Sequence, residues 1–187
     1  MNKIKTWDQL EGWFDYEGLY QQIGTQYKNS VLVEVGSWLG KSVAFLASVS
    51  ELHKNNNKIY AIDTWNGLDV NYMEEIKQKY NKPSIYDIFK DNINDCGFEN
   101  VITPIVSCSW EAAENFENES CDFIFIDADH SYESVKKDIL AWYPKLKPGG
   151  VFAGHDIFAD QIKQAATDGL GNFNKTWSQA GSCWVMA

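Results

Sequence analysis

The sequence predicts an α/β protein with an open, mostly parallel sheet, and three stretches of the chain predict it. The run VLVEV at 31–35 precedes a glycine turn and an apolar helical pattern at 42–52, as in a buried parallel strand that leads into a helix. Two further apolar runs, at 58–63 and 121–127, also end on an acidic residue. Since ligands bind at the carboxyl ends of the strands in such sheets, we expect these acids to surround one site.

The N-terminal residues are expected to lie outside the sheet. Residues 6–26 carry apolar side chains at loose helical spacing, so we predict that 1–28 form a helical cap on the sheet edge or over the ligand. The further elements expected are a strand at 101–106, a helix at 131–143, a turn at Pro148-Gly149-Gly150 and strands at 151–154 and 183–187.

A long connection separates the second strand from the third. Residues 66–92 exceed the usual length of a connection, and segments of this length usually have a function. Tyr72, Tyr80, Tyr86 and Pro83 suggest a helical excursion, and we predict that it forms a lid over the site.

The glycine loop GSWLGKS at 36–42 can be compared with the loops that bind three kinds of ligand. A P-loop has four residues between its first glycine and Gly-Lys-Ser, whereas this loop has three. A dinucleotide fingerprint starts with Gly-x-Gly, but Glu34 stands at the first glycine and would repel a pyrophosphate. S-adenosylmethionine (SAM) has no phosphate and carries an ammonium group that an acid can receive. The spacing of Glu34, Gly36 and Gly40 therefore favours SAM.

The tip of the second strand supports the same ligand. Asp63 ends this strand, where sheets of this kind hold the two ribose hydroxyls of an adenosine. Trp65, two residues later, is placed to lie against the adenine face. The alternative is that Asp63 caps a turn and Trp65 belongs to the core.

Four motifs in the same order resemble the class I SAM-dependent methyltransferases: VEVGSWLGKS, IDTWNG, DFIFIDADHSYESVKKDI and LKPGGVFAGHD. The branch they resemble most is the small O-methyltransferases of catechol and sugar type, including the group related to cephalosporin-biosynthesis methyltransferases. The resemblance runs from 13 to 156. It implies a single domain over 1–187, a Rossmann-like three-layer αβα sandwich, and a mostly parallel seven-stranded sheet whose last strand is antiparallel. It also implies O-methylation of a small hydroxylated molecule, sugar or catechol-like.

The resemblance implies a role for the polar residues at the strand tips. Glu34 and Gly36 would hold the methionine portion of SAM, and Gly40 would allow close helix packing. Asp63 would take the ribose hydroxyls, and Ser109 with its neighbour would border the adenine. The full cofactor-binding set predicted is Glu34, Gly36, Ser37, Gly40, Ser42, Asp63, Thr64, Trp65, Ser109, Trp110 and Asp127.

Catalysis is assigned to Asp127 and His155, which follow two neighbouring strands. In one version Asp127, His155 and Asp156 hold a divalent metal that lowers the pKa of the acceptor hydroxyl. Manganese or zinc would suit this mixed ligand set better than magnesium, because the family's metal-dependent members have an acid where His155 stands. In the other version His155 is the general base, with an ordinary pKa near 6.5. His130 is a reserve candidate for this role.

Composition limits the partners. Acidic residues outnumber basic ones 26 to 16, and a net charge of −10 argues against binding nucleic acid. No stretch approaches a membrane span, and the N-terminus has no apolar signal region. Four cysteines without Cys-x-x-Cys spacing suggest free thiols and a cytoplasmic location. We expect a small-molecule acceptor as the partner, and a homodimer could cover the sheet edge at 183–187.

Two alternatives to this enzyme stay open. The chain could bind SAM without catalysis, as a sensor or partner subunit, because His155 replaces the expected acid. A P-loop-like nucleotidase is a weaker alternative: the strand that ends at Asp127 resembles its magnesium-binding strand, but the glycine loop is one residue short.

Overall fold

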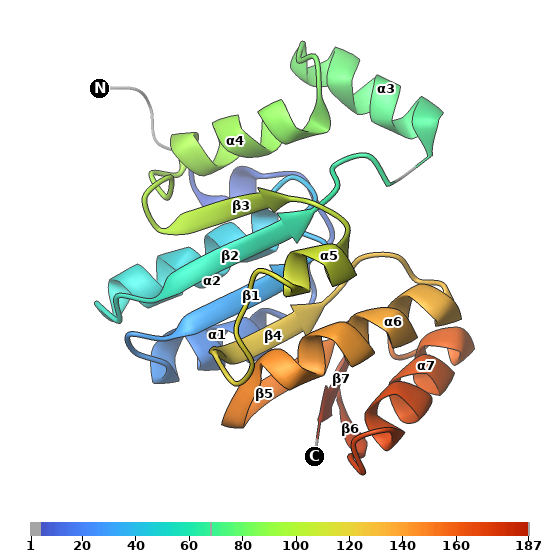
Figure 1. Cartoon of the computed structure of the whole chain (residues 1–187). Helices are drawn as coiled ribbons and strands as arrows, with labels where there is room; N and C mark the ends of the chain where they lie inside the picture. Colours follow the sequence, from blue (N-terminus) through green and yellow to red (C-terminus); the bar gives the residue numbers. More distant parts are fainter. Residues whose placement is uncertain (1–4, 68, 187) are drawn as a thin grey trace.

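A seven-stranded sheet with the strand order β3-β2-β1-β4-β5-β7-β6 forms the middle of the molecule (Figure 1). The structure is a computed structural model, and it describes residues 5–67 and 69–186. The strands are β1 (Val31–Val35), β2 (Lys58–Asp63), β3 (Ile102–Val106), β4 (Cys121–Ile126), β5 (Leu146–Gly154), β6 (Trp177–Ala180) and β7 (Cys183–Met186). β1 to β5 pair in parallel, whereas β7 is antiparallel to both β5 and β6. The predicted fold class is therefore confirmed.

Helices cover both faces of the sheet. They are α1 (Glu17–Gln26), α2 (Lys41–Leu52), α3 (Val70–Tyr80), α4 (Ile85–Asp95), α5 (Ser109–Ala113), α6 (Tyr132–Trp142) and α7 (Asp160–Gly171), with short 3-10 turns η1 (Trp7–Gln9) and η2 (Tyr143–Lys145). Figure 1 shows α5 and α6 on the side of the sheet opposite α1 and α2. Along β1, Leu32 enters the core beneath α1 and α2, while Val33 and Val35 enter the core beneath α6 and α7. Burial on both faces explains why these strands are almost wholly apolar.

The long connection forms two capped helices. The Asp69 side chain accepts hydrogen bonds from two backbone N–H groups at the start of α3, and the Ser84 side chain caps α4 in the same way. The apolar stripe of α4 packs into the core beside α2, whereas α3 extends away from the sheet (Figure 1). The predicted excursion is thus helical, with residue 68 outside the described part.

Two features of the sheet differ from the prediction. Pro148, Gly149 and Gly150 do not form a turn but lie within β5, where its register to β4 shifts between Cys121 and Phe123. Four residues of β5, 147–150, lie opposite one residue of β4, Asp122, and Gly149 has a left-handed conformation with φ +83°. The edge strand β6 was not predicted, because its residues are mostly exposed and show no apolar alternation.

The ends of the predicted elements fall partly outside the described residues. Residues 1–4 of the N-terminal cap and Ala187 of the last strand lie there. Within the described ranges, no helix is long and apolar enough to cross a membrane.

Candidate active site

A cavity of about 880 Å³ opens at the carboxyl edge of the sheet. The arrowheads of β1, β2 and β4 point toward this edge in Figure 1. Loops after β1, β2, β3, β4 and β5 line it, together with the N-terminal stretch between η1 and α1. Of the predicted site residues, Gly36, Ser37, Ser42, Asp63, Thr64, Trp65, Ser109, Trp110, Asp127, His155 and Asp156 are in this lining.

Gly36 brings the first loop into contact with the end of β4. Its N–H donates to the Ile62 carbonyl at 2.7 Å, and the Asp127 N–H donates to the Val35 carbonyl at 2.8 Å. A Cβ at position 36 would lie 2.0 Å from the Asp127 carbonyl oxygen, and φ is +92°. Only glycine fits this approach, which holds the floor of the cavity in place.

Glu34 is a fully buried carboxyl group beside this floor. The Tyr20 hydroxyl donates to its Oε2 at 2.7 Å. Burial raises the pKa of Glu34 to about 7, although the hydrogen bond from Tyr20 opposes the shift. Its other oxygen, Oε1, has no hydrogen-bond partner among the described residues.

Asp63 stands at the tip of β2 with both oxygens bound by the backbone. Oδ1 accepts from the N–H of Trp65 at 2.8 Å and Oδ2 from the N–H of Trp38 at 2.9 Å. Burial raises the pKa of Asp63, and these backbone N–H groups oppose it. Each carboxylate oxygen can accept a second hydrogen bond, so the group remains able to bind hydroxyls in the cavity.

The indole of Trp65 belongs mainly to the core. Its side chain is only 5% exposed, and its ring lies 4.7 Å from Phe89 and 4.8 Å from Tyr86 between centroids. Its N–H donates to the Trp38 carbonyl at 2.7 Å. This packing matches the structural alternative for Trp65 and leaves little of the ring for contact with a base.

Gly40 contributes by packing and does not line the cavity. It caps the start of α2 with φ +91°, and a Cβ there would lie 2.9 Å from Ile93 and 3.1 Å from Phe89. Glycine at this position lets α2 start beside α4.

Ser109 and Trp110 start α5 on the far side of the cavity. The Ser109 hydroxyl accepts the indole N–H of Trp142 at 2.9 Å. The Lys137 ammonium lies 3.5 Å from the centroid of a Trp110 ring. Both residues are therefore fixed by α6.

Asp127 is the centre of a charged cluster. Its Oδ2 accepts from the Tyr16 hydroxyl at 3.0 Å, and its Oδ1 lies 3.4 Å from His155 Nδ1 and 3.7 Å from His130 Nε2. Burial would raise the pKa of Asp127, but the two imidazoles and the tyrosine lower it below its ordinary value. The carboxylate is thus held in its charged form.

His155 is bound at both ring nitrogens. Nε2 lies 2.8 Å from Asp15 Oδ1, and Nδ1 lies 3.3 Å from Asp156 Oδ2. Burial alone would lower the pKa of His155, but Asp127, Asp15 and Asp156 raise it to about 9. This value differs from the pKa near 6.5 on which the general-base hypothesis rested.

Among the described residues, Asp127, His130 and Asp156 form a group that could hold a metal. One ligand atom from each lies within 4.8 Å of the others. His130 Nε2 is 3.1 Å from Asp156 Oδ2. This set has His130 where the predicted set has His155, whose Nδ1 also lies 3.4 Å from Asp127 Oδ1 and 3.3 Å from Asp156 Oδ2.

Several residues of the site were not predicted. Asp15, Tyr16, Tyr20 and Ser182 reach it from segments far along the chain, and Ser182 donates to Asp15 at 2.7 Å. Tyr20 lies within the apolar segment at 6–26, which gives no sign of a contact with Glu34. Asp138 of α6 also lines the cavity, and its place in the sequence resembles that of any polar helix residue.

The fold and this cavity define an α/β protein with a ligand-sized cavity at the carboxyl ends of its parallel strands, the edge where such sheets bind ligands. The family described as "Methyltransferase domain" matches residues 33–157. The chain belongs to this family, and the resemblance drawn from the four motifs is confirmed.

One curated relative is an uncharacterised protein, y4gI, of Sinorhizobium fredii. It is 26% identical over 125 residues, which are 67% of this chain but only 13% of that protein. The chain therefore spans a small part of the length of this relative.

Solved structures share the fold at low identity. The O-methyltransferase NovP has a TM-score of 0.69 at 13% identity, covering 90% of this chain and 77% of NovP. A SAM-dependent O-methyltransferase from Thermotoga maritima has a TM-score of 0.61 at 14% identity, covering 96% of this chain and 67% of that chain. At these identities the likeness concerns the fold alone.

Proposed function

We propose that this chain transfers a methyl group from SAM to a hydroxyl oxygen of a small molecule. The observation that carries the proposal is a single cavity lined both by Gly36, Ser37 and Asp63 and by the cluster around Asp127. The first group suits a cofactor, and the second suits the chemistry of an acceptor hydroxyl. A methyltransferase has to bring these two functions together in one space.

The cofactor end of the cavity has the donors and acceptors that SAM requires. Asp63 lines the cavity, and each of its carboxylate oxygens can accept a further hydrogen bond. Glu34 is fully buried outside this lining, two residues before Gly36. Gly36 has no side chain to block the floor. When bound there, SAM supplies an electrophilic methyl group, so the protein has mainly to orient the acceptor oxygen toward it.

An aromatic group at the cavity supports a ring-bearing acceptor such as a sugar or a catechol. Trp13 is 68% exposed, and its ring lies 6.5 Å from Trp38 and 6.2 Å from Tyr72 between centroids. Trp13 and Trp38 line the cavity. Planar apolar faces of this kind pack against the rings of small ligands.

The same aromatic group connects α3 to the site. Tyr72 of α3 stacks on Trp38 at 5.9 Å, and Lys79 and Tyr80 contact Glu11 at 2.6 and 3.0 Å. We propose on this basis that residues 66–92 act as a lid over the acceptor. The lid would close against the N-terminal stretch that contains Glu11 and Trp13.

The charged cluster supports two roles in proton handling. Asp127, His130 and Asp156 form a mixed oxygen and nitrogen set that fits manganese or zinc. Such an ion supplies a Lewis acid that lowers the pKa of a bound hydroxyl. His155 keeps a proton between Asp127 and Asp15 and thereby fixes the orientation of the Asp127 carboxylate.

Calorimetry with S-adenosylhomocysteine tests the cofactor assignment, and ATP and NAD serve as comparison ligands. Binding of S-adenosylhomocysteine alone is expected, while binding of ATP or NAD alone would refute the class of ligand. Turnover against a panel of hydroxylated rings then separates an enzyme from a SAM-binding sensor. A methylated product supports the enzyme.

The metal requirement is tested by assaying turnover after EDTA treatment. We expect activity to fall and to return with added Mn²⁺ or Zn²⁺. Full activity in EDTA would reject the metal, and unchanged activity in His155→Ala would reject a role for His155.

A further inference from the structure

Lys41, the first residue of α2, is a charged residue at the cavity for which the proposed mechanism has no role. It is half-buried, and it is the one lysine in the cavity lining of a chain that has no arginine. Among the described residues, no carboxylate oxygen lies within 4.0 Å of its ammonium nitrogen. This ammonium group is therefore available to pair with a ligand in the cavity.

The same cavity is rich in carboxyl groups, so the lack of a partner for Lys41 does not come from a shortage of acids. The acidic residues of the lining are Glu11, Asp15, Asp63, Asp127, Asp129, Asp138 and Asp156. Several of them pair with other cations. Glu11 Oε2 lies 2.6 Å from Lys79 Nζ, and Asp15 Oδ1 lies 2.8 Å from His155 Nε2. The Lys41 charge stays unmatched beside them.

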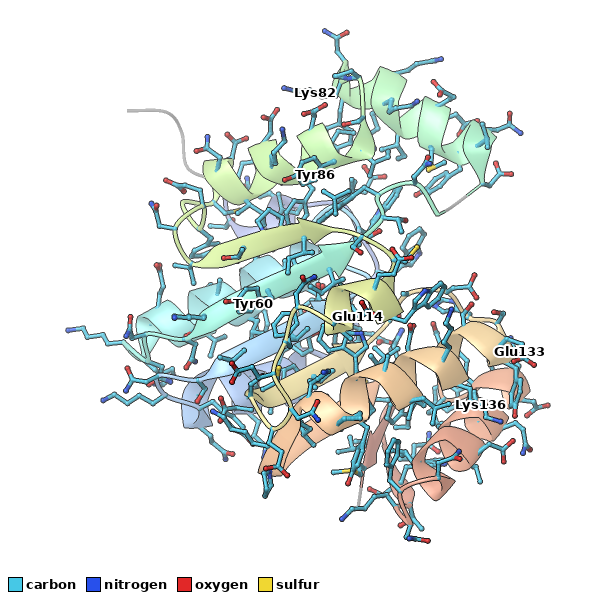
Figure 2. The ribbon with its side chains drawn as sticks, in the orientation of Figure 1. Tyr60, Lys82, Tyr86, Glu114, Glu133 and Lys136 are labelled. Atoms are coloured by element: carbon cyan, nitrogen blue, oxygen red, sulfur yellow. The ribbon has the colours of Figure 1, made fainter. Side chains whose placement is uncertain are left out.

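Lysines on the outer surface are in a different situation. Lys82, which Figure 2 shows between α3 and α4, pairs with Asp91. Lys58 is exposed at the start of β2, the end of the strand opposite the cavity, where water solvates its ammonium group. Lys41 combines a half-buried position in a ligand-sized cavity with the absence of an acidic partner in the described part of the chain.

Lys41 lies beside the aromatic group that is proposed to hold the acceptor ring. A Cβ built on Gly12 would lie 3.4 Å from Lys41 Cβ and 3.8 Å from Trp38 Cδ1, so both side chains border the same point of the backbone. Trp13 follows Gly12 in the chain, and its ring lies 6.5 Å from that of Trp38 between centroids. A ring packed against Trp13 and Trp38 would therefore have the Lys41 side chain near its edge.

We propose that Lys41 selects an acceptor that carries a carboxylate on its ring, either a hydroxylated aromatic acid or a sugar acid. This inference rests on the proposed function, because it assumes that the acceptor ring lies against Trp13 and Trp38. The carboxylate accepts a hydrogen bond from the ammonium group, and the two charges neutralise each other. One lysine matches a monoanion, whereas a phosphate dianion would keep a negative charge close to the acids of the lining.

The test uses two pairs of acceptors in which a neutral carboxamide replaces the carboxylate. The pairs are protocatechuate with its amide and glucuronate with glucuronamide, so their comparison also shows which kind of ring is bound. Each compound is titrated into the protein by calorimetry with excess S-adenosylhomocysteine and Mn²⁺. We expect the wild-type protein to bind the acid of one pair at least about tenfold tighter than its amide, the scale of one hydrogen bond to a charged group.

Three variants make the result interpretable. Lys41→Met removes the charge and keeps an unbranched side chain, so the ratio of acid to amide affinity should fall to about one. Lys41→Arg retains the charge and should retain a preference for the acid. Lys58→Met is the matched control, because it removes a lysine charge from the opposite edge of the sheet, and it should keep the wild-type ratio.

A contact of Lys41 with the cofactor would give a different pattern. If the ammonium group pairs with the carboxylate of the cofactor, Lys41→Met weakens binding of S-adenosylhomocysteine and leaves the ratio of acid to amide unchanged. That result would overturn the inference, as would a wild-type ratio of one for both pairs or no binding of either acid. Failure of the wild-type protein to bind S-adenosylhomocysteine would instead refute the proposed function.

Discussion

At the scale of single residues, the backbone of Gly36 lies so close to Asp127 that a Cβ at position 36 would be 2.0 Å from the Asp127 carbonyl oxygen. In Gly36→Ala the new Cβ would collide with the Asp127 carbonyl. We expect unfolding free energy to fall by about 3 kcal/mol or more, as for other severe steric substitutions, and S-adenosylhomocysteine binding to be lost. Urea unfolding and calorimetry measure the two effects.

Gly97→Ala is the matched control for this substitution. Gly97 also has a positive φ, +78°, but open space around its Cβ position. It should cost only the backbone strain of about 1–2 kcal/mol and keep ligand binding. Equal losses in the two variants would contradict the importance of the contact with Asp127.

Glu34 gives a prediction for stability as a function of pH. Its folded pKa is raised from 4.5 to about 7, so its stabilising contribution is full below pH 4.5 and is lost as pH rises through 7. Glu34→Gln removes this titration and retains an acceptor for Tyr20. Between pH 5 and pH 8 the wild-type protein should therefore lose up to about 3 kcal/mol relative to the variant.

Urea unfolding of both proteins at the two pH values measures this difference. Titration of the other carboxyl groups cancels in the comparison. Parallel pH dependence of the wild type and the variant would show that Glu34 ionises in the folded state as readily as in the unfolded state.

Sequence reasoning identified the site residues that follow strands better than those that reach the site from elsewhere. Asp63, Asp127 and His155 could be predicted because each ends a strand, and parallel strands end at one edge. Asp15 and Ser182 could not, since they meet only through pairing across 167 positions of the chain.

At the scale of elements, α3 is attached to the body by its buried Met73 and Ile76 and by the stack of Tyr72 on Trp38. Tyr72→Ala removes its stack on Trp38. We expect faster hydrogen exchange over residues 70–80 and a higher KM for the acceptor, with unchanged affinity for S-adenosylhomocysteine. Val70→Ala is the control, because Val70 is 66% exposed at the start of the same helix. Equal hydrogen-exchange rates over residues 70–80 in the two variants would show that the Tyr72 stack does not hold α3 in place.

The strands and helices differ in how well the sequence predicts them. β1, β2 and β4 are apolar runs buried on both faces, and their pattern alone is sufficient. β6 has no such pattern, because it is an edge strand paired only with β7. Proline and two glycines predict a turn within 146–154. In the structure these residues instead form a bulge in β5, because the strand pairs with β4 on both sides of them.

At the scale of the whole molecule, ligand binding should stabilise the fold. S-adenosylhomocysteine at 100 times its Kd should add about 2.7 kcal/mol, which raises Tm by about 5–10 °C for a chain of this size. ATP and NAD should leave Tm unchanged. Thermal unfolding with each ligand measures this, and a shift with ATP alone would support the nucleotidase instead.

The hydrogen bond between Asp15 and Ser182 has a consequence for biosynthesis. Asp15 is translated early and Ser182 late. Asp15 contacts the His155 ring, and Ser182 donates a hydrogen bond to Asp15. A growing chain can pair β1 with β2 and β4 long before residue 182 has been added. The charges around His155 reach their final arrangement only after β7 joins the sheet. A nascent chain on the ribosome can thus hold most of its core while the hydrogen-bonded cluster around His155 is still incomplete.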